Sequence, residues 1–349
     1  MTPNPFPATS SKAGHGEIRV SLLPPDKPVL ETMSYQYPLK LISPPPVEVL
    51  SRSLSSTSKQ SDVKGPNSRL VYTVFLLTYG GGLVGGDSVD LSVSLASSTR
   101  LVLLTQGSTK IFKSPTQSVL TSQVTSLVVG TNSALLWLPD PVQPFADSSF
   151  QQTQRYKLAD AQHSNVCVLD WVCEGRKARD ETWDFWGYRS MNEVWLEIPD
   201  GPEDKQDKKK EKLLLRDSLI LDSTRAASRA DFRAKMQDVG AYGTLVLGGS
   251  LFASLGAYFL SEFRALPRIG NKQWDAPPTE TVEEAQRARR VKQEEQDGLL
   301  WTAATVRSLV IVKFGARETE GAKRWLATML KTEGTVVREF GEGSLLCLR

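Results

Sequence analysis

Apolar and polar residues alternate over short distances in the first half of the chain, which predicts strands rather than helices. The segment SVDLSVSL, residues 88–95, places two valines and two leucines on one face and three serines and Asp90 on the other. Continuous apolar runs such as LVYTVFLLTY (70–79) and NVCVLDWVCEG (165–175) read as buried strands separated by Gly, Pro, Asn and Asp. We therefore expect residues 70–175 to form a long run of strands without a well-defined helix.

Helical periodicity appears only in the C-terminal part. In TEGAKRWLATMLK, residues 319–331, apolar side chains recur at i, i+3, i+4, i+7 and i+8, with Thr319 as the expected N-cap. Residues 221–236 and 250–263 are also expected to be helical, and 305–315 to be a strand. The predicted fold class is mainly β with a few helices (α+β). We expect a large β-helix-like, stacked-sheet scaffold with its helices mostly in the C-terminal half.

Three polar segments interrupt this pattern: 51–68, 199–212 and 277–297. Their composition predicts mobile insertions. The last one is polar on nearly every face, so both an exposed helix and a disordered arm remain open for it. Together with a flexible N-terminus over residues 1–14, these insertions leave a single domain spanning 15–349.

The composition is that of a soluble globular protein. Of 349 residues, 40% are hydrophobic and 23% charged, and the net charge of +3 is too small to favour a nucleic-acid partner. Three cysteines cannot form a disulfide framework, so we expect a reducing, cytoplasmic location. Residues 239–261 lack charged side chains over a length that could span a bilayer. Five glycines lower the hydrophobicity of this window, so we expect a strand and a helix there and no membrane partner.

The stretch YGGGLVGGD, residues 79–87, contains two near matches to phosphate-binding motifs. Both motifs require a helix directly afterwards, whereas a strictly alternating strand follows here, and Asp87 stands where a P-loop has its lysine. The sequence therefore favours a structural turn made by Gly80, Gly81, Gly82, Gly85 and Gly86. The Asp87 carboxylate either accepts hydrogen bonds from amides of this turn or faces a polar passage or a metal-handling surface.

Residues for tight metal binding or hydrolysis are scarce. The two histidines, His15 and His163, stand alone, and no CxxC or GxSxG motif occurs. A hydrolase would have to use His163 as its base. Carboxylates, one cysteine and waters could still hold a borderline ion such as nickel weakly.

An ordered series of segments resembles the motifs of the urease accessory protein D family (UreD, also called UreH). The series is GGGLVGGD, TQGSTKIFKS, LPDPVQPFADSSFQQTQRYKL and DWVCEGRKARDETWDFWGYRS, and AYGTLVLGG and VRSLVIVKFGARETEGAKRWL are similar to later family blocks. The resemblance covers about residues 15–345 and is interrupted by the three polar segments. Tyr79, and Asp180 before Glu181, depart from the residues common in bacterial members.

This resemblance implies a non-enzymatic, β-rich scaffold. Such a protein binds a helical accessory protein (UreF), recruits a nickel-carrying GTPase (UreG) and docks on apo-urease. Nickel is in transit along a polar tunnel, and no cofactor is tightly bound. By motif position, the residues expected to line or organise this passage, as weak and transient metal contacts, are Asp87, Ser108, Thr109, Asp147 and Glu181. The alternative is a passive adaptor that bridges urease and the GTPase complex without touching metal.

Overall fold

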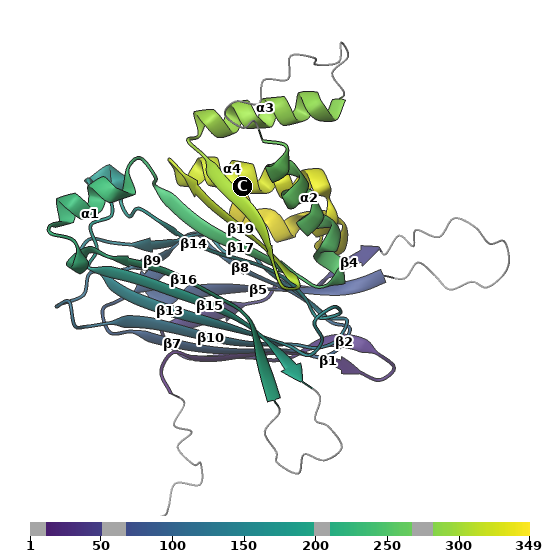
Figure 1. Ribbon diagram of the computed structural model, residues 1–349. Helices are drawn as coiled ribbons and strands as arrows, with labels where there is room; N and C mark the ends of the chain where they lie inside the picture. Colours follow the sequence, from purple (N-terminus) through teal and green to yellow (C-terminus); the bar gives the residue numbers. More distant parts are fainter. Residues whose placement is uncertain (1–11, 51–67, 199–209, 267–281) are drawn as a thin grey trace, which may run out of the picture.

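Two β-sheets lie face to face, and most of the helices pack on the outer side of one of them (Figure 1). The computed structural model describes residues 12–50, 68–198, 210–266 and 282–349. The seven-stranded sheet has the strand order β16–β15–β13–β10–β7–β1–β2. Its strands are β1 (His15–Leu23), β2 (Lys27–Tyr35), β7 (Ser88–Leu95), β10 (Thr121–Val129), β13 (Ser149–Leu158), β15 (Gly187–Ile198) and β16 (Lys210–Asp222).

The larger, twelve-stranded sheet runs β18–β19–β17–β14–β11–β8–β5–β3, with four short strands attached beside this path. Its main strands are β3 (Leu39–Ile42), β5 (Ser68–Thr78), β8 (Arg100–Thr105), β11 (Ala134–Trp137), β14 (Asn165–Cys173), β17 (Ala241–Gly248), β18 (Leu300–Val306) and β19 (Leu309–Ala316). The attached strands are β4 (Val47–Leu50), β6 (Gly82–Leu83), β9 (Thr109–Ile111) and β12 (Val142–Pro144).

The middle of the chain winds as a coil. Strands β5, β8, β11 and β14 are parallel neighbours in the larger sheet, and β7, β10, β13 and β15 are parallel neighbours in the other. Consecutive main strands therefore alternate between the two sheets, which is the β-helix-like, stacked-sheet arrangement that we expected. The predicted α+β fold class is confirmed, and the structure has no α-helix between residues 70 and 175.

Two apolar layers hold the structure together. One lies between the sheets and contains the inward side chains of the coil, such as Leu91, Leu103 and Leu127, all fully buried. The other lies between the larger sheet and the helices, where Trp171, Phe259 and Trp325 are buried. The helices of the second layer include α2 (Ala253–Arg264), α4 (Thr319–Glu333) and α5 (Thr335–Phe340), while α1 (Arg229–Met236) lies apart near the strand ends (Figure 1).

Three local predictions need correction. Of residues 221–236, only Arg229–Met236 form an α-helix, whereas Leu221 and Asp222 end β16. Helix α4 already includes Thr319, and its N-cap is Glu318, whose side chain makes no capping bond. Residues 305–315 are not one strand, because the chain reverses at Arg307, whose φ is 55°, and joins β18 to β19 as a hairpin. Residues 239–261 divide into β17 and the start of α2, as expected. Across the described parts of the chain, no helix has both the length and the apolar character needed to cross a bilayer.

The predicted insertions 51–68 and 199–212 lie almost entirely outside the described residues, apart from Ser68 in β5 and residues 210–212 in β16. In the third segment, residues 282–296 form helix α3 (Val282–Gln296). This helix is anchored on one side, because Glu262 of α2 accepts hydrogen bonds from Arg287 and Arg290. The helical alternative is therefore the one that the structure adopts over these residues.

Candidate functional site

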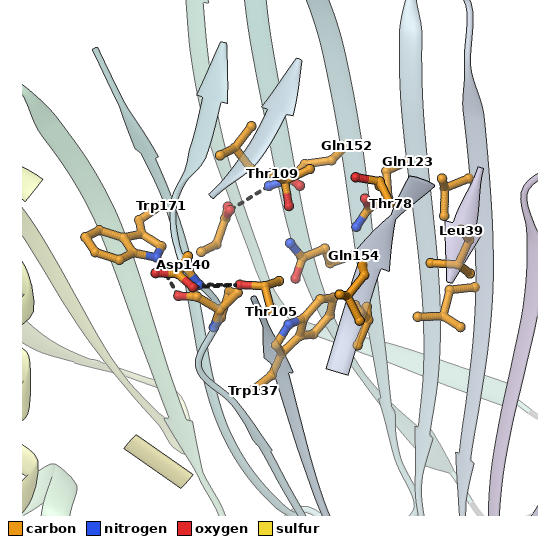
Figure 2. A pocket seen from close by; sticks show the side chains of 17 residues that line it. Leu39, Thr78, Thr105, Thr109, Gln123, Trp137, Asp140, Gln152, Gln154 and Trp171 are labelled. Atoms are coloured by element: carbon orange, nitrogen blue, oxygen red, sulfur yellow. Dashed lines mark hydrogen bonds between the residues drawn. The ribbon is translucent and has the colours of Figure 1, made fainter. Parts of the chain in front are cut away.

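A hollow lined by both polar and apolar side chains, called the chamber below, lies between the two sheets (Figure 2). Its lining combines apolar and polar side chains from both sheets: Leu39, Leu76, Leu77, Thr78, Val89, Leu91, Thr105, Thr109, Gln123, Trp137, Pro139, Asp140, Val142, Gln152, Gln154, Asp170 and Trp171. The volume open to the centres of water molecules is about 50 Å³. Since one water needs about 10–15 Å³ of such space, the chamber has room for about three to five waters.

Three glutamines of the seven-stranded sheet give the chamber its polar character. Gln123 on β10 and Gln152 and Gln154 on β13 occupy positions that alternate with outward residues, so the strand period turns them inward. Burying an amide is costly unless it is hydrogen-bonded. Gln152 Nε2 donates to Asp170 Oδ1 and lies 3.0 Å from the Ser190 hydroxyl and 3.2 Å from the Tyr188 hydroxyl, and Gln154 Oε1 accepts from the Tyr156 hydroxyl. These bonds make the polar lining a fixed part of the fold.

Asp170 on β14 is the central carboxylate of the chamber. Oδ1 accepts from Gln152 Nε2 at 2.6 Å, and Oδ2 accepts from Ser190 Oγ at 2.5 Å and Asn192 Nδ2 at 2.6 Å. Burial raises the pKa of Asp170 above its ordinary value, and these hydrogen bonds partly oppose that shift. The protein therefore holds a desolvated carboxylate in place with three donors.

Asp170 also borders a second hollow, called the edge pocket, which lies between β16 and the strands β17, β18 and β19. The edge pocket includes Leu219, Tyr242, Thr244, Leu300 and Lys313 and has a volume of about 410 Å³. Leu300 is 73% exposed, so this pocket reaches the surface. Asp170 thus stands between the chamber and a surface opening.

A second carboxylate lies in contact with the edge pocket. Asp217 on β16 accepts from Lys313 Nζ at 2.5 Å and from Thr244 Oγ1 at 3.1 Å, and both donors line the pocket. Its negative charge contributes to the raised pKa of Asp170. Two carboxylates therefore follow one another from the chamber toward solvent.

The glycine stretch is a turn, and Asp87 closes it. Asp87 Oδ2 accepts from the Val84 amide at 2.9 Å, and the Asp87 amide donates to the Val84 carbonyl at 3.0 Å. Gly80 and Gly81 have φ of 72° and 76°, a conformation that glycine adopts without strain. Of the two interpretations left open for Asp87, the bond to an amide of its own turn is present, and Asp87 is not among the residues lining the chamber.

Asp147 and Glu181 are held by arginines. Asp147 accepts from Arg229 and from Lys113 at 2.9 Å, and these bonds lower its pKa. Both oxygens of Glu181 accept from Arg176, which likewise lowers the pKa of Glu181. Neither carboxylate lines the chamber, so in this structure both connect loops at strand ends.

Of the five residues carried over by motif position, Thr109 lines the chamber and its neighbour Ser108 does not. Sequence reasoning missed Gln123, Gln152, Gln154 and Asp170. A signal for them was present in the strand sequences, because each is a polar residue at an inward position where leucine or valine is usual.

Replacing Asp147 with alanine should lower the free energy of unfolding by about 1–2 kcal/mol, because two charge-assisted hydrogen bonds are lost at a partly exposed site. Urea denaturation measures this. Asp180→Ala is the matched control, since Asp180 shares the left-handed backbone (φ 59° at both positions) but is exposed. An equal loss of unfolding free energy in the two variants would mean that the ion pairs of Asp147 contribute nothing measurable to stability.

His163 lies on a turn, with Nδ1 3.1 Å from Asp160, and its ring is about half exposed. His15 begins β1. Within the described ranges, no group of three or more His, Cys, Asp or Glu side chains converges as a metal-binding cluster. The three cysteines in this part of the chain are free thiols and are buried.

Comparison with known proteins agrees with the sequence resemblance. The family model described as UreD urease accessory protein matches residues 13–342. An uncharacterised urease accessory protein ureD-like of Schizosaccharomyces pombe is 31% identical over 75% of this chain and 82% of its own length. Urease accessory protein 4 of Cryptococcus neoformans is 29% identical over 95% of this chain and 93% of its own, and urease accessory protein D of Arabidopsis thaliana is 33% identical over 52% and 55%. Since the family model spans nearly the whole chain, this protein belongs to the UreD urease accessory protein family.

Proposed function

We propose that this protein is a scaffold that conveys nickel to apo-urease during urease maturation, together with a UreF-like helical protein and a UreG-like GTPase. Membership of the family supports a role in urease maturation. The observation that carries the finer proposal is the chamber, which contains buried glutamines and two carboxylates, one of which, Asp170, also borders a pocket reaching the surface. The protein acts as a conduit and partner platform rather than as an enzyme, with nickel as its cargo.

The side chains that line the chamber suit the passage of a divalent ion. Carboxylate, amide and hydroxyl oxygens can replace part of the hydration shell of a divalent ion. A conduit must also release its ion, so a complete cage of strong ligands would be a disadvantage. The chamber offers scattered oxygen donors and room for a few waters, which favours weak, sequential contacts.

A passive adaptor is the second candidate. It is favoured by one observation, namely that Asp147 and Glu181 are already paired with arginine or lysine side chains. In that case the protein bridges urease and the GTPase complex, and metal never enters the chamber.

Filling the chamber distinguishes the two candidates. Thr109→Trp introduces an indole into the lining, and we expect it to reduce nickel content and urea hydrolysis severalfold in urease co-expressed with all accessory proteins. Ser108→Trp is the matched control, because Ser108 is adjacent in sequence but does not line the chamber. A pull-down of urease measures assembly separately. If Thr109→Trp assembles and loads nickel like Ser108→Trp, metal does not pass through the chamber and the adaptor is correct.

A further inference from the structure

Thr105 and Asp140 lie close together at one side of the chamber (Figure 2), where Lys323 of α4 contacts Asp140 and Cys347 contacts Thr105. Asp140 follows β11 and Thr105 ends β8, and both line the chamber. Asp140 Oδ2 accepts from Thr105 Oγ1 at 3.2 Å and from the Gly107 amide at 3.0 Å. These bonds fix the carboxylate but use only one of its oxygens.

The other oxygen, Oδ1, accepts from Lys323 Nζ at 2.8 Å. Lys323 belongs to α4 in the helical layer, and its side chain is only 15% exposed. Asp140 itself is 7% exposed. A positive charge of the protein is therefore paired with a carboxylate that also lines the chamber.

Cys347 completes the cluster. Its thiol Sγ donates to the Thr105 carbonyl at 3.2 Å and lies 3.9 Å from Thr105 Oγ1. Burial, with a smaller contribution from the Asp140 carboxylate, raises the pKa of the Cys347 thiol to about 11. One carboxylate, one hydroxyl and one thiol are thus linked by direct contacts, and the ammonium group of Lys323 pairs with the carboxylate.

This donor set suits a borderline divalent ion, because nickel accepts both oxygen and sulfur ligands. Waters of the chamber would supply the remaining ligands. Trp137 Nε1, which belongs to the same lining and is buried, has no hydrogen-bond partner among the described residues. An unpaired buried donor of this kind is usually satisfied by an ordered water or a ligand that accepts a hydrogen bond.

We propose that Asp140, Cys347 and Thr105 form a divalent-cation position that Lys323 occupies as a built-in counter-ion until it is displaced. This inference rests on the proposed conveyance of cations through the chamber. On binding, the Cys347 thiol gives its proton to solvent, the metal forms bonds to Sγ and Asp140 Oδ1, and the Lys323 ammonium group moves away. Because Lys323 lies on α4 and two of the ligands lie on or beside strands of the larger sheet, a shift of this helix relative to the sheet exposes the position.

The test uses the purified full-length chain and nickel chloride, without urease. Lys323→Met removes the counter-ion, and we expect it to bind Ni²⁺ at least about tenfold more tightly than the wild-type chain by calorimetry, a difference of about 1.4 kcal/mol. The double variant Asp140→Asn/Lys323→Met should lose this gain. With Co²⁺ in place of Ni²⁺, Lys323→Met should show a thiolate-to-metal absorption band that is absent from Cys347→Ser/Lys323→Met.

Lys331→Met, at an exposed position of the same helix, is the matched control and should bind nickel like the wild type. Because Lys323→Met leaves a buried carboxylate unpaired, Lys323→Gln serves as a second variant that keeps a hydrogen-bond donor. Unchanged nickel affinity in both folded variants, or a gain that survives Asp140→Asn, overturns the proposal. A confirmed site combined with full nickel loading by Thr109→Trp would instead refute conveyance through the chamber.

Discussion

Replacing Asp170 with asparagine should lower the nickel content of co-expressed urease about tenfold while the protein remains folded and assembled. Asp170 is the carboxylate shared by the chamber and the edge pocket, so a cation passing between them meets its charge. A unit charge at about 4 Å contributes about 4 kcal/mol in surroundings of intermediate polarity. If the substitution removes a third of this interaction energy, the cation passes about tenfold more slowly.

The fold should tolerate this change. Burial places the pKa of Asp170 above its ordinary value of 3.8, so the ionised side chain is less favourable in the folded than in the unfolded protein. Stability therefore declines as the pH rises from about 3.8 through the raised pKa, and asparagine removes that contribution. Urea denaturation at acidic and neutral pH should show an unfolding free energy for Asp170→Asn that is unchanged or higher at neutral pH.

Nickel bound per urease, urea hydrolysis and recovery of the complex are the three measurements. Ser190→Ala is the matched control, because it removes a hydrogen bond to Asp170 and keeps the charge. We expect this control to retain most of the loading. Wild-type loading by Asp170→Asn would exclude this carboxylate from the route of the metal.

Glu262→Ala should destabilise the protein by about 3 kcal/mol and release helix α3. Glu262 is 7% exposed and accepts from Arg287 Nη2 at 2.7 Å and from Arg290 Nη1 at 2.6 Å. Removing it leaves the Arg290 side chain, 9% exposed, with Glu294 as its remaining ion-pair partner. An incompletely compensated buried charge is more costly than the loss of a surface pair.

This loss should depend on pH. Arg287 and Arg290 hold the pKa of Glu262 below its ordinary value of 4.5, so its contribution is complete above that value and disappears as the pH falls through the lowered pKa. Urea denaturation at neutral and acidic pH, with hydrogen exchange over residues 282–296, measures both effects. Glu295→Ala, an exposed glutamate on the same helix, should change little. Normal exchange protection of α3 in Glu262→Ala would show that other contacts hold the helix.

The sequence predicts the sheets better than the site. Alternation over residues 88–95 depends only on the strand period, so it identifies strand and inward face without knowledge of partners. The chamber depends on which inward side chains of one sheet meet which of the other. Gln152 and Asp170 are 18 residues apart and come from different sheets, so the sequence pattern of neither strand alone indicates that their side chains form a hydrogen bond.

The role of Asp87 and Glu181, which were selected by motif position, is difficult to predict for a different physical reason. Asp87 and Glu181 stand at chain reversals, where acidic side chains serve equally well as local hydrogen-bond acceptors and as ligands. Sequence alone does not separate these two uses. The structure shows that the Glu181 carboxylate is already engaged, because it accepts hydrogen bonds from Arg176 and from the Ala146 amide.

The coil of alternating strands also constrains how the chain acquires its structure. Leu91 lies beside Thr125 in one sheet, and Thr125 lies beside Gln154, so neighbours on successive strands are about thirty residues apart in the chain. Contacts of this range form slowly, because each requires closure of a long loop before burial compensates the lost entropy. A chain divided between β10 and β11 would present unpaired edges in both halves. We therefore expect neither half to fold independently, and the full-length chain to reach its native state in seconds rather than milliseconds.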